Sequence, residues 1–147
     1  MKHRLIFTVF FLSFSFNVIG NDTEIIDSLH MALNNSKGNE RVNLLNRLST
    51  LYRSYEIDKV GHLSKVAIDV AHEEGFNEGE AIAHENLAWY FSKKDIGDSA
   101  VISYLKALDY YEVTNKLDET ASIYNSLGIS LMNSGRYSES LDYLVKS

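Results

Sequence analysis

The chain contains no cysteine and no proline among its 147 residues. The absence of cysteine excludes disulfides, thiolate metal sites and a lipid-modified cysteine. Without proline nothing interrupts a helix from within, so the composition favours helices joined by Gly, Asn and Asp turns. Basic residues are outnumbered as well, with 14 Lys and Arg against 20 Asp and Glu and a net charge of −6. An acidic surface repels phosphate backbones, so nucleic acid is not an expected partner.

The first twenty residues have the pattern of an export signal. Residues 1–4 are basic, and residues 5–16 form an apolar run that is too short to span a membrane comfortably. We therefore predict a signal peptide over residues 1–20 and an exported, periplasmic or extracellular protein. The alternative is that this segment stays as an anchor in the inner membrane. Cleavage would remove Lys2 and Arg4 and leave a net charge of about −8.

The spacing of apolar residues predicts seven helices after that segment. Asp22 or Thr23 could cap the first one. Glycines at positions 75 and 79 are both expected to adopt the left-handed conformation that ends helices. The expected ranges are 24–33, 40–55, 58–74, 78–93, 99–113, 119–133 and 138–146.

A unit of forty residues recurs along the chain. The stretch HENLAWYFSKKDIGDSAVISYL, which begins at His84, aligns without a gap on the stretch that begins at Tyr124. Leu87 falls on Leu127 and Ala88 on Gly128. The earlier segment RVNLLNRLSTLYRSY fits if one residue is dropped near its end. A fixed period with small residues at the same places is the mark of a repeat protein.

These residues resemble the tetratricopeptide repeat family. The pattern of that family is clearest from Ala121 to Ser147, with Leu-Gly in the first helix, Gly and Tyr in the turn and Ser140 at a small position. The resemblance implies an all-α, right-handed solenoid of antiparallel helix pairs. It places an N-terminal helix and connection at residues 21–40 and repeats at about 41–80, 81–120 and 121–147, the last one truncated. The small positions Ser49, Ala88 and Gly128, with Val60, Ala100 and Ser140, would let paired helices approach closely.

The forty-residue period differs from the usual 34 of this family. It is similar to the N-terminal arrays of exported or membrane-anchored bacterial signalling proteins. The sequence ends on a helix whose apolar residues Leu141, Leu144 and Val145 need a cover, since such arrays require a polar capping element. The chain is therefore expected to be the front part of a longer protein, or else to be covered by a partner or a second copy. Apart from the signal segment or a missing downstream part, no contact with a membrane is expected.

No catalytic constellation is visible. The histidines have no HExxH-like spacing, no serine stands in a GxSxG elbow, and no glycine-rich phosphate loop occurs. Zinc at His72, Glu73 and His84 is a remote alternative, because His84 falls at a packing position of the repeat. We expect no cofactor, no metal and no enzyme activity in this segment.

The remaining candidate is the concave groove that the resemblance implies, lined by the first helix of each pair. Asparagine amides there could bond a peptide backbone, and Trp89, the single tryptophan, could anchor a partner. The alternative is that Trp89 is buried between helices. The predicted groove residues are Asn46, Arg53, Glu85, Trp89, Lys93, Asn125, Ile129 and Asn133; Asn43, Thr50, Ile82 and Ser122 fall at equivalent places.

The resulting prediction is a repeat module that binds a protein or peptide, as the exported sensor or interaction part of a bacterial signalling protein. The alternative is the N-terminal fragment of a larger enzyme, such as a membrane-bound sensor histidine kinase whose catalytic part lies beyond residue 147. A structural scaffold without a specific ligand is the third possibility.

Overall fold

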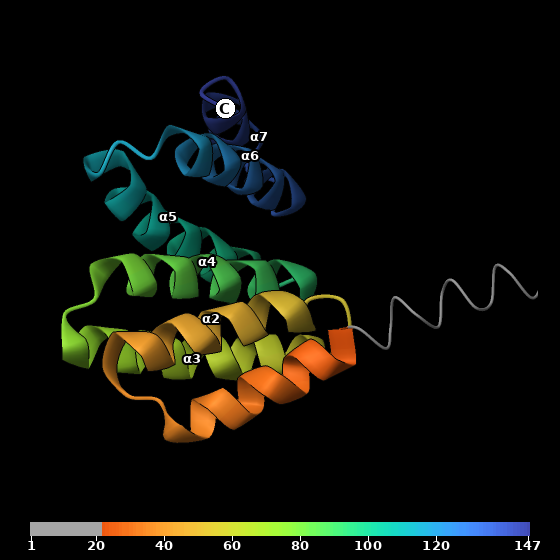
Figure 1. Cartoon of the computed structure of the whole chain (residues 1–147). Helices are drawn as coiled ribbons and strands as arrows, with labels where there is room; N and C mark the ends of the chain where they lie inside the picture. Colours follow the sequence, from red (N-terminus) through yellow and green to blue (C-terminus); the bar gives the residue numbers. More distant parts are fainter. Residues whose placement is uncertain (1–21) are drawn as a thin grey trace, which may run out of the picture. The chain divides into compact units, whose positions relative to one another are not determined.

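The computed structural model describes residues 22–147, so the predicted signal peptide lies outside the described part. Residues 22–147 form seven helices and no strand, as the apolar spacing predicts. The chain divides into two compact units, residues 1–35 and 36–147. The described part of the first unit is one helix over residues 22–35, shown in red and orange in Figure 1. It extends the predicted range by two residues at each end.

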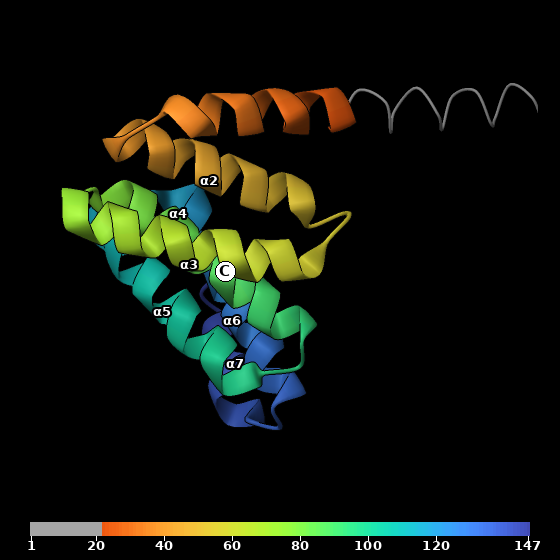
Figure 2. The same cartoon turned by 90° about the horizontal axis from the view of Figure 1, so that it is seen from below.

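The second unit contains the other six helices. Each one packs on the next along the chain, and α2 also contacts α4 (Figures 1 and 2). No helix could bury its apolar side alone, so the neighbours supply the core between them. The helices are α2 (Gly38–Tyr52), α3 (Ile57–Glu74), α4 (Asn77–Lys93), α5 (Gly97–Val113), α6 (Leu117–Asn133) and α7 (Tyr137–Leu144).

The last four turns of this unit share one geometry, repeated every twenty residues. Gly75, Asp95, Asn115 and Gly135 all have positive φ, between 55° and 75°. The N–H of the following residue donates to the carbonyl five positions earlier, at 2.9 Å in every case. This backbone bond closes the end of each helix, and the next helix begins two residues after the left-handed residue. The forty-residue repeat is therefore built from two helix-turn steps of equal length.

The turn between α2 and α3 differs. Here the N–H of Glu56 donates to the carbonyl of Tyr52, four positions earlier, at 2.9 Å. The start of α3 follows that of α2 by nineteen residues, where the later steps are twenty. This is the place where the sequence alignment required one residue to be dropped. The predicted continuation of this helix to Tyr55 is wrong, because the tighter turn ends it at Tyr52.

The predicted small positions lie where paired helices cross. Ser49, Ala88, Val60 and Ala100 are fully buried, and the Ser140 hydroxyl donates to the Gly128 carbonyl at 2.7 Å. A Cβ atom on Gly128 would lie 2.5 Å from Leu144 Cγ. Close approach of the helices at this crossing is thus confirmed for the last pair. Leu144 is partly covered by this contact, which corrects the expectation that it needs an outside cover.

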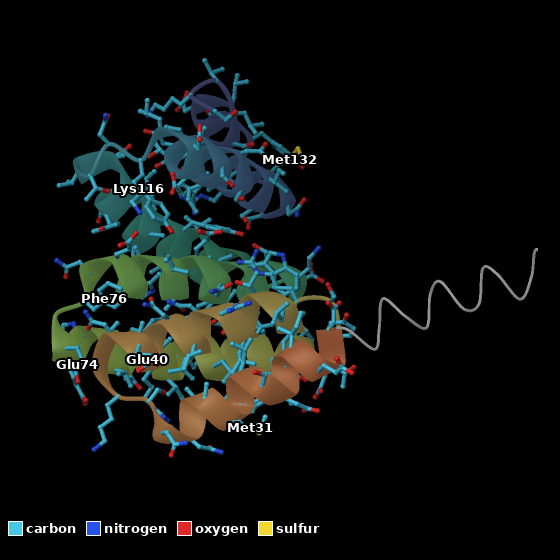
Figure 3. The ribbon with its side chains drawn as sticks, in the orientation of Figure 1. Met31, Glu40, Glu74, Phe76, Lys116 and Met132 are labelled. Atoms are coloured by element: carbon cyan, nitrogen blue, oxygen red, sulfur yellow. The ribbon has the colours of Figure 1, made fainter. Side chains whose placement is uncertain are left out.

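Gly79 does not end a helix, contrary to prediction. It lies in the first turn of α4, while Gly75 alone has the left-handed conformation. A Cβ atom on Gly79 would lie 2.4 Å from the ring of Phe76, which precedes α4 in Figure 3, and 2.6 Å from Val42 of α2. The glycine is therefore a point of contact between α2 and α4.

The helix α7 ends at Leu144, two residues earlier than predicted. Its outer side carries Tyr137, Leu141 and Val145, which are 71%, 62% and 79% exposed. The spacing of four residues between them places all three on one stripe. Three strongly exposed apolar residues therefore lie in one row at the end of the described part of the chain.

Candidate functional site

Polar side chains tie α2 to α4. The Asn46 amide donates to the carbonyl of Gly79 at 2.8 Å, and the Arg53 guanidinium donates to Asn86 Oδ1, also at 2.8 Å. The Thr50 hydroxyl donates to the same Asn86 oxygen at 3.3 Å. Asn46, Thr50 and Arg53 are spaced by four and three residues, so α2 presents them on one face. We call this set, with Glu85, Asn86, Trp89 and Lys93 of α4 and Tyr111 of α5, the α2–α4 polar face.

Glu85 extends the polar face to α5. One carboxylate oxygen lies 3.8 Å from the Arg53 guanidinium, and the other accepts a hydrogen bond from the Tyr111 hydroxyl at 3.1 Å. Burial of the Tyr111 side chain raises the pKa of its hydroxyl, and the charge of Glu85 raises it further. The hydroxyl therefore stays protonated and acts as a fixed donor, which holds Glu85 in place beneath Arg53.

Trp89 is neither fully buried nor fully exposed. The Arg53 guanidinium carbon lies 5.2 Å from the centre of its ring, and Lys93 Nζ lies 5.6 Å from it. Both are cation–π distances. One part of the indole is thus covered by the neighbouring helices and two cations, and the remainder is accessible to solvent. The indole is therefore partly buried between helices and partly accessible to a partner, so each of the two alternatives for Trp89 applies in part.

Several buried polar atoms of this face have no hydrogen-bond partner. They are Asn46 Oδ1, Arg53 Nε and Asn86 Nδ2. Asn46 is 5% exposed and Asn86 only 1%. Leaving such groups unpaired costs about 1–3 kcal/mol each. The sequence predicts Asn46 as a ligand-binding amide, but its nitrogen donates to the Gly79 carbonyl and its oxygen is buried.

The predicted residues on α6 do not join this network. Asn125, Ile129 and Asn133 are exposed on α6, together with Ser122. A side-chain hydrogen bond between α4 and α6 instead joins Ser92 and Ser130, whose hydroxyls lie 3.0 Å apart. Asn133 lies beside those serines in a small hollow that also includes Asp95 and Gly97. The structure thus brings together Asn46, Arg53, Glu85, Trp89 and Lys93, and leaves the α6 residues as a separate exposed row.

Two members of the polar face, Asn86 and Tyr111, were not predicted. Asn86 lies beside a groove position in the sequence, but it is buried between α2 and α4. Tyr111 belongs to a second helix of a pair, which the resemblance assigns to the outer side. In the sequence, the only signal for Asn86 is its position: it is a polar residue next to Leu87, in a stripe that is otherwise apolar.

Comparison with family models and with curated proteins gives no match for this chain. The site is accordingly described from its own residues alone.

Within residues 22–147 no group of three His, Asp or Glu side chains is arranged to hold a metal ion. The carboxylate that lies between His72 and His84 belongs to Glu80, and not to Glu73 as in the zinc alternative. His72 Nδ1 lies 3.7 Å and His84 Nε2 lies 3.9 Å from Glu80 Oε1. In the same part of the chain no helix is long and apolar enough to cross a membrane.

Two long-range ion pairs join α4 to neighbouring parts of the chain, one to α3 and one to the turn before α6. Lys116, at the turn between α5 and α6 in Figure 3, pairs with Glu78 in the first turn of α4. Lys94 pairs with Asp58 of α3 at 2.7 Å. The pKa of each lysine is raised by its hydrogen bond to the carboxylate. Both pairs are partly exposed, so each contributes little to stability.

His84 makes stability depend on pH. Burial lowers the pKa of its imidazole, and the nearby Lys106 lowers it further against the smaller opposite effect of Glu80. The folded protein therefore keeps the ring neutral, whereas the unfolded chain takes up a proton below about pH 6.5. The free energy of unfolding should be fully retained above that pH and fall as the pH drops below it, because the unfolded chain then binds the proton first.

Urea unfolding at several pH values tests this expectation. The decline between about pH 7 and 5.5 should become shallower in His84→Gln. The exposed His62→Gln serves as a matched control that keeps the decline. An equal slope in wild type and His84→Gln would contradict the assignment.

Proposed function

We propose that this chain is a tetratricopeptide-like interaction module that holds a peptide or protein segment on its α2–α4 polar face. The observation that carries the proposal is Trp89, a partly accessible indole that lies within cation–π distance of Arg53 and Lys93. The buried atoms Asn46 Oδ1, Arg53 Nε and Asn86 Nδ2 near it have no hydrogen-bond partner. The polar groups of a peptide backbone therefore meet a surface that is polar as well as aromatic.

The arrangement of Trp89 supports binding of a partner rather than a purely structural role. An indole with one side packed and one side accessible supplies a large rigid contact at low entropic cost, which is why tryptophan is enriched in binding hot spots. Arg53 and Lys93 lie within cation–π distance of its ring, and Glu85 lies 3.8 Å from Arg53. The row of Asn125, Ile129 and Asn133 on α6 would extend the same face by one repeat.

The right-handed superhelical path, the export of the chain and its place in a bacterial signalling protein belong to the same proposal. They are supported by the forty-residue period, by the regular stacking of helix pairs and by the sequence of residues 1–20. The exposed stripe of α7 supports a second proposal, self-association of the module through Tyr137, Leu141 and Val145. Sedimentation velocity of wild type against Leu141→Glu tests it, and a single monomer species in both would contradict it.

The binding proposal is tested with a display library of extended peptides selected on the wild-type chain. Trp89→Ala should weaken capture of the selected peptides by about thirtyfold or more, the effect of losing a hot-spot residue. Trp89→Phe should recover part of the affinity, because it keeps an aromatic face between the two cations.

Tyr90→Phe is the matched control, because Tyr90 is the neighbouring aromatic and packs on Gly61 of α3 rather than on the polar face. Its capture should equal that of wild type. If Trp89→Ala combined with Asn125→Ala binds the peptides as wild type does, the polar face is not the binding site.

A further inference from the structure

A second hollow lies on another side of α4, between α4 and α5. Its volume is about 410 Å³. Asn77, Glu80 and His84 of α4 line it, together with Lys106, Asp109 and Tyr110 of α5. Clefts of about 300–1,000 Å³ are the usual size for small ligands or a single inserted side chain. None of these residues belongs to the α2–α4 polar face, so the cleft is a separate place on the molecule.

His84 at this cleft is buried and unsatisfied. The residue is 7% exposed, and its Nδ1 atom has no hydrogen-bond partner. Its other ring nitrogen lies 3.9 Å from Glu80 Oε1, beyond hydrogen-bonding distance. Burial keeps the pKa of the ring low, so the imidazole is neutral and one of its nitrogens is an acceptor. His84 therefore gives the wall of the cleft an uncharged polar ring with a buried, unpaired nitrogen.

The charges around the cleft favour a cation. Glu80 and Asp109 supply two carboxylates, Lys106 supplies one ammonium, and the neutral His84 adds no charge. The Asn77 side chain adds a carbonyl oxygen, so acceptors dominate. The partly buried ring of Tyr110 offers a face on which a cation can stack. The whole chain carries a net charge of −6, which also attracts cations toward it.

We propose that the α4–α5 cleft binds a guanidinium or ammonium group on a short apolar arm. The carboxylates of Glu80 and Asp109 accept its hydrogen bonds, and the arm lies against Tyr110. The group can come from two sources, a free small cation or a basic side chain of a protein bound to the module. Both have the same chemistry at the cleft, and the experiment separates them.

The test is a titration of the isotope-labelled full chain followed by NMR. Nα-acetyl-L-argininamide (hereafter argininamide), whose guanidinium is its one charged group, is the probe, and Nα-acetyl-L-citrullinamide (hereafter citrullinamide), which replaces the guanidinium with a neutral urea of the same shape, is the matched control. Argininamide should give saturable shifts at His84 and Tyr110, and citrullinamide should bind about tenfold more weakly or less. Glu80→Gln with Asp109→Asn should weaken argininamide binding by about tenfold or more, whereas Lys106→Met should strengthen it.

A blocked pentapeptide with one central arginine between glycines shows whether the cation in the cleft is a free small molecule or a basic side chain of a partner. Binding at least about tenfold tighter than that of argininamide assigns the cleft to a basic side chain of a partner, and equal or weaker binding assigns it to a free cation. The absence of a saturable shift, an equal response to citrullinamide, or unchanged affinity in the carboxylate double variant overturns the proposal. Trp89→Ala should leave this titration unchanged, so failure of the peptide-binding face and failure of the cleft are distinguished. Circular dichroism confirms that each variant is folded.

Discussion

Replacing Leu127 with alanine is expected to lower the free energy of unfolding by about 2–5 kcal/mol. Leu127 is fully buried in α6, in the cluster that also contains Ala88, Ala100 and Tyr104. Truncation removes apolar surface from the core and leaves a cavity that rigid helices on both sides cannot close. The loss should be concentrated in the last two helices, because in a stack each helix pair depends mainly on its neighbours.

Hydrogen exchange together with urea unfolding measures this effect. In Leu127→Ala the amides of α6 and α7 should lose protection at conditions where those of α2 and α3 keep it. Ile129→Ala is the matched control: it is two residues away on the same helix but 44% exposed, so it should cost less than about 1 kcal/mol. A uniform loss of protection over all helices would mean that the unit unfolds as one block and not as a stack.

Replacing Gly79 with valine is expected to lower the free energy of unfolding by about 3 kcal/mol and to loosen α2 from α4. Even a Cβ atom at this position would lie 2.4 Å from the Phe76 ring and 2.6 Å from Val42 Cγ1. Val42 is fully buried, so it has no free space to move into. Displacement of the α4 backbone would also lengthen the bond from the Asn46 amide to the Gly79 carbonyl, now 2.8 Å.

The matched control for this variant is Gly75→Ala. Gly75 has a φ of 65°, and a Cβ atom added there meets nothing within 4 Å. That change costs only the conformational strain of a left-handed residue, about 1 kcal/mol. Differential scanning calorimetry of both variants separates contact from strain. If Gly79→Val melts at or above the temperature of Gly75→Ala, the contact between α2 and α4 is not tight.

The sequence predicts the helices well because two independent patterns agree. Apolar residues recur at helical spacing, and turn-forming residues stand between the helices. The predicted starts of α3 to α7 lie within two residues of the observed ones. The twenty-residue step is not visible in the sequence, because the same left-handed position is occupied by Gly75, Asp95, Asn115 and Gly135. Gly, Asp and Asn all tolerate this conformation, so the residue type varies while the backbone conformation stays the same.

The site is less predictable than the helices. Positions on one helix face follow from spacing, so the sequence places Glu85, Trp89 and Lys93 on one side of a helix. The bond from Arg53 to Asn86 and the bond from Tyr111 to Glu85 join residues 33 and 26 positions apart. Such contacts depend on how closely and at what angle the helices cross, and small residues such as Gly79 set that distance. A glycine in a helix start has no local pattern that distinguishes it from a glycine in a cap.

The equal length of successive helix-turn steps limits how this chain can change by insertion or deletion. One extra residue inside α4, α5 or α6 would turn everything after it by about 100° around the helix axis and present polar groups to the interior. Loss or gain of a complete forty-residue block would preserve every contact surface. The shorter connection after Tyr52 shows that a single-residue change is tolerated at the border between the first two helices of the array. Length variation among natural variants should therefore occur in whole blocks or at that border.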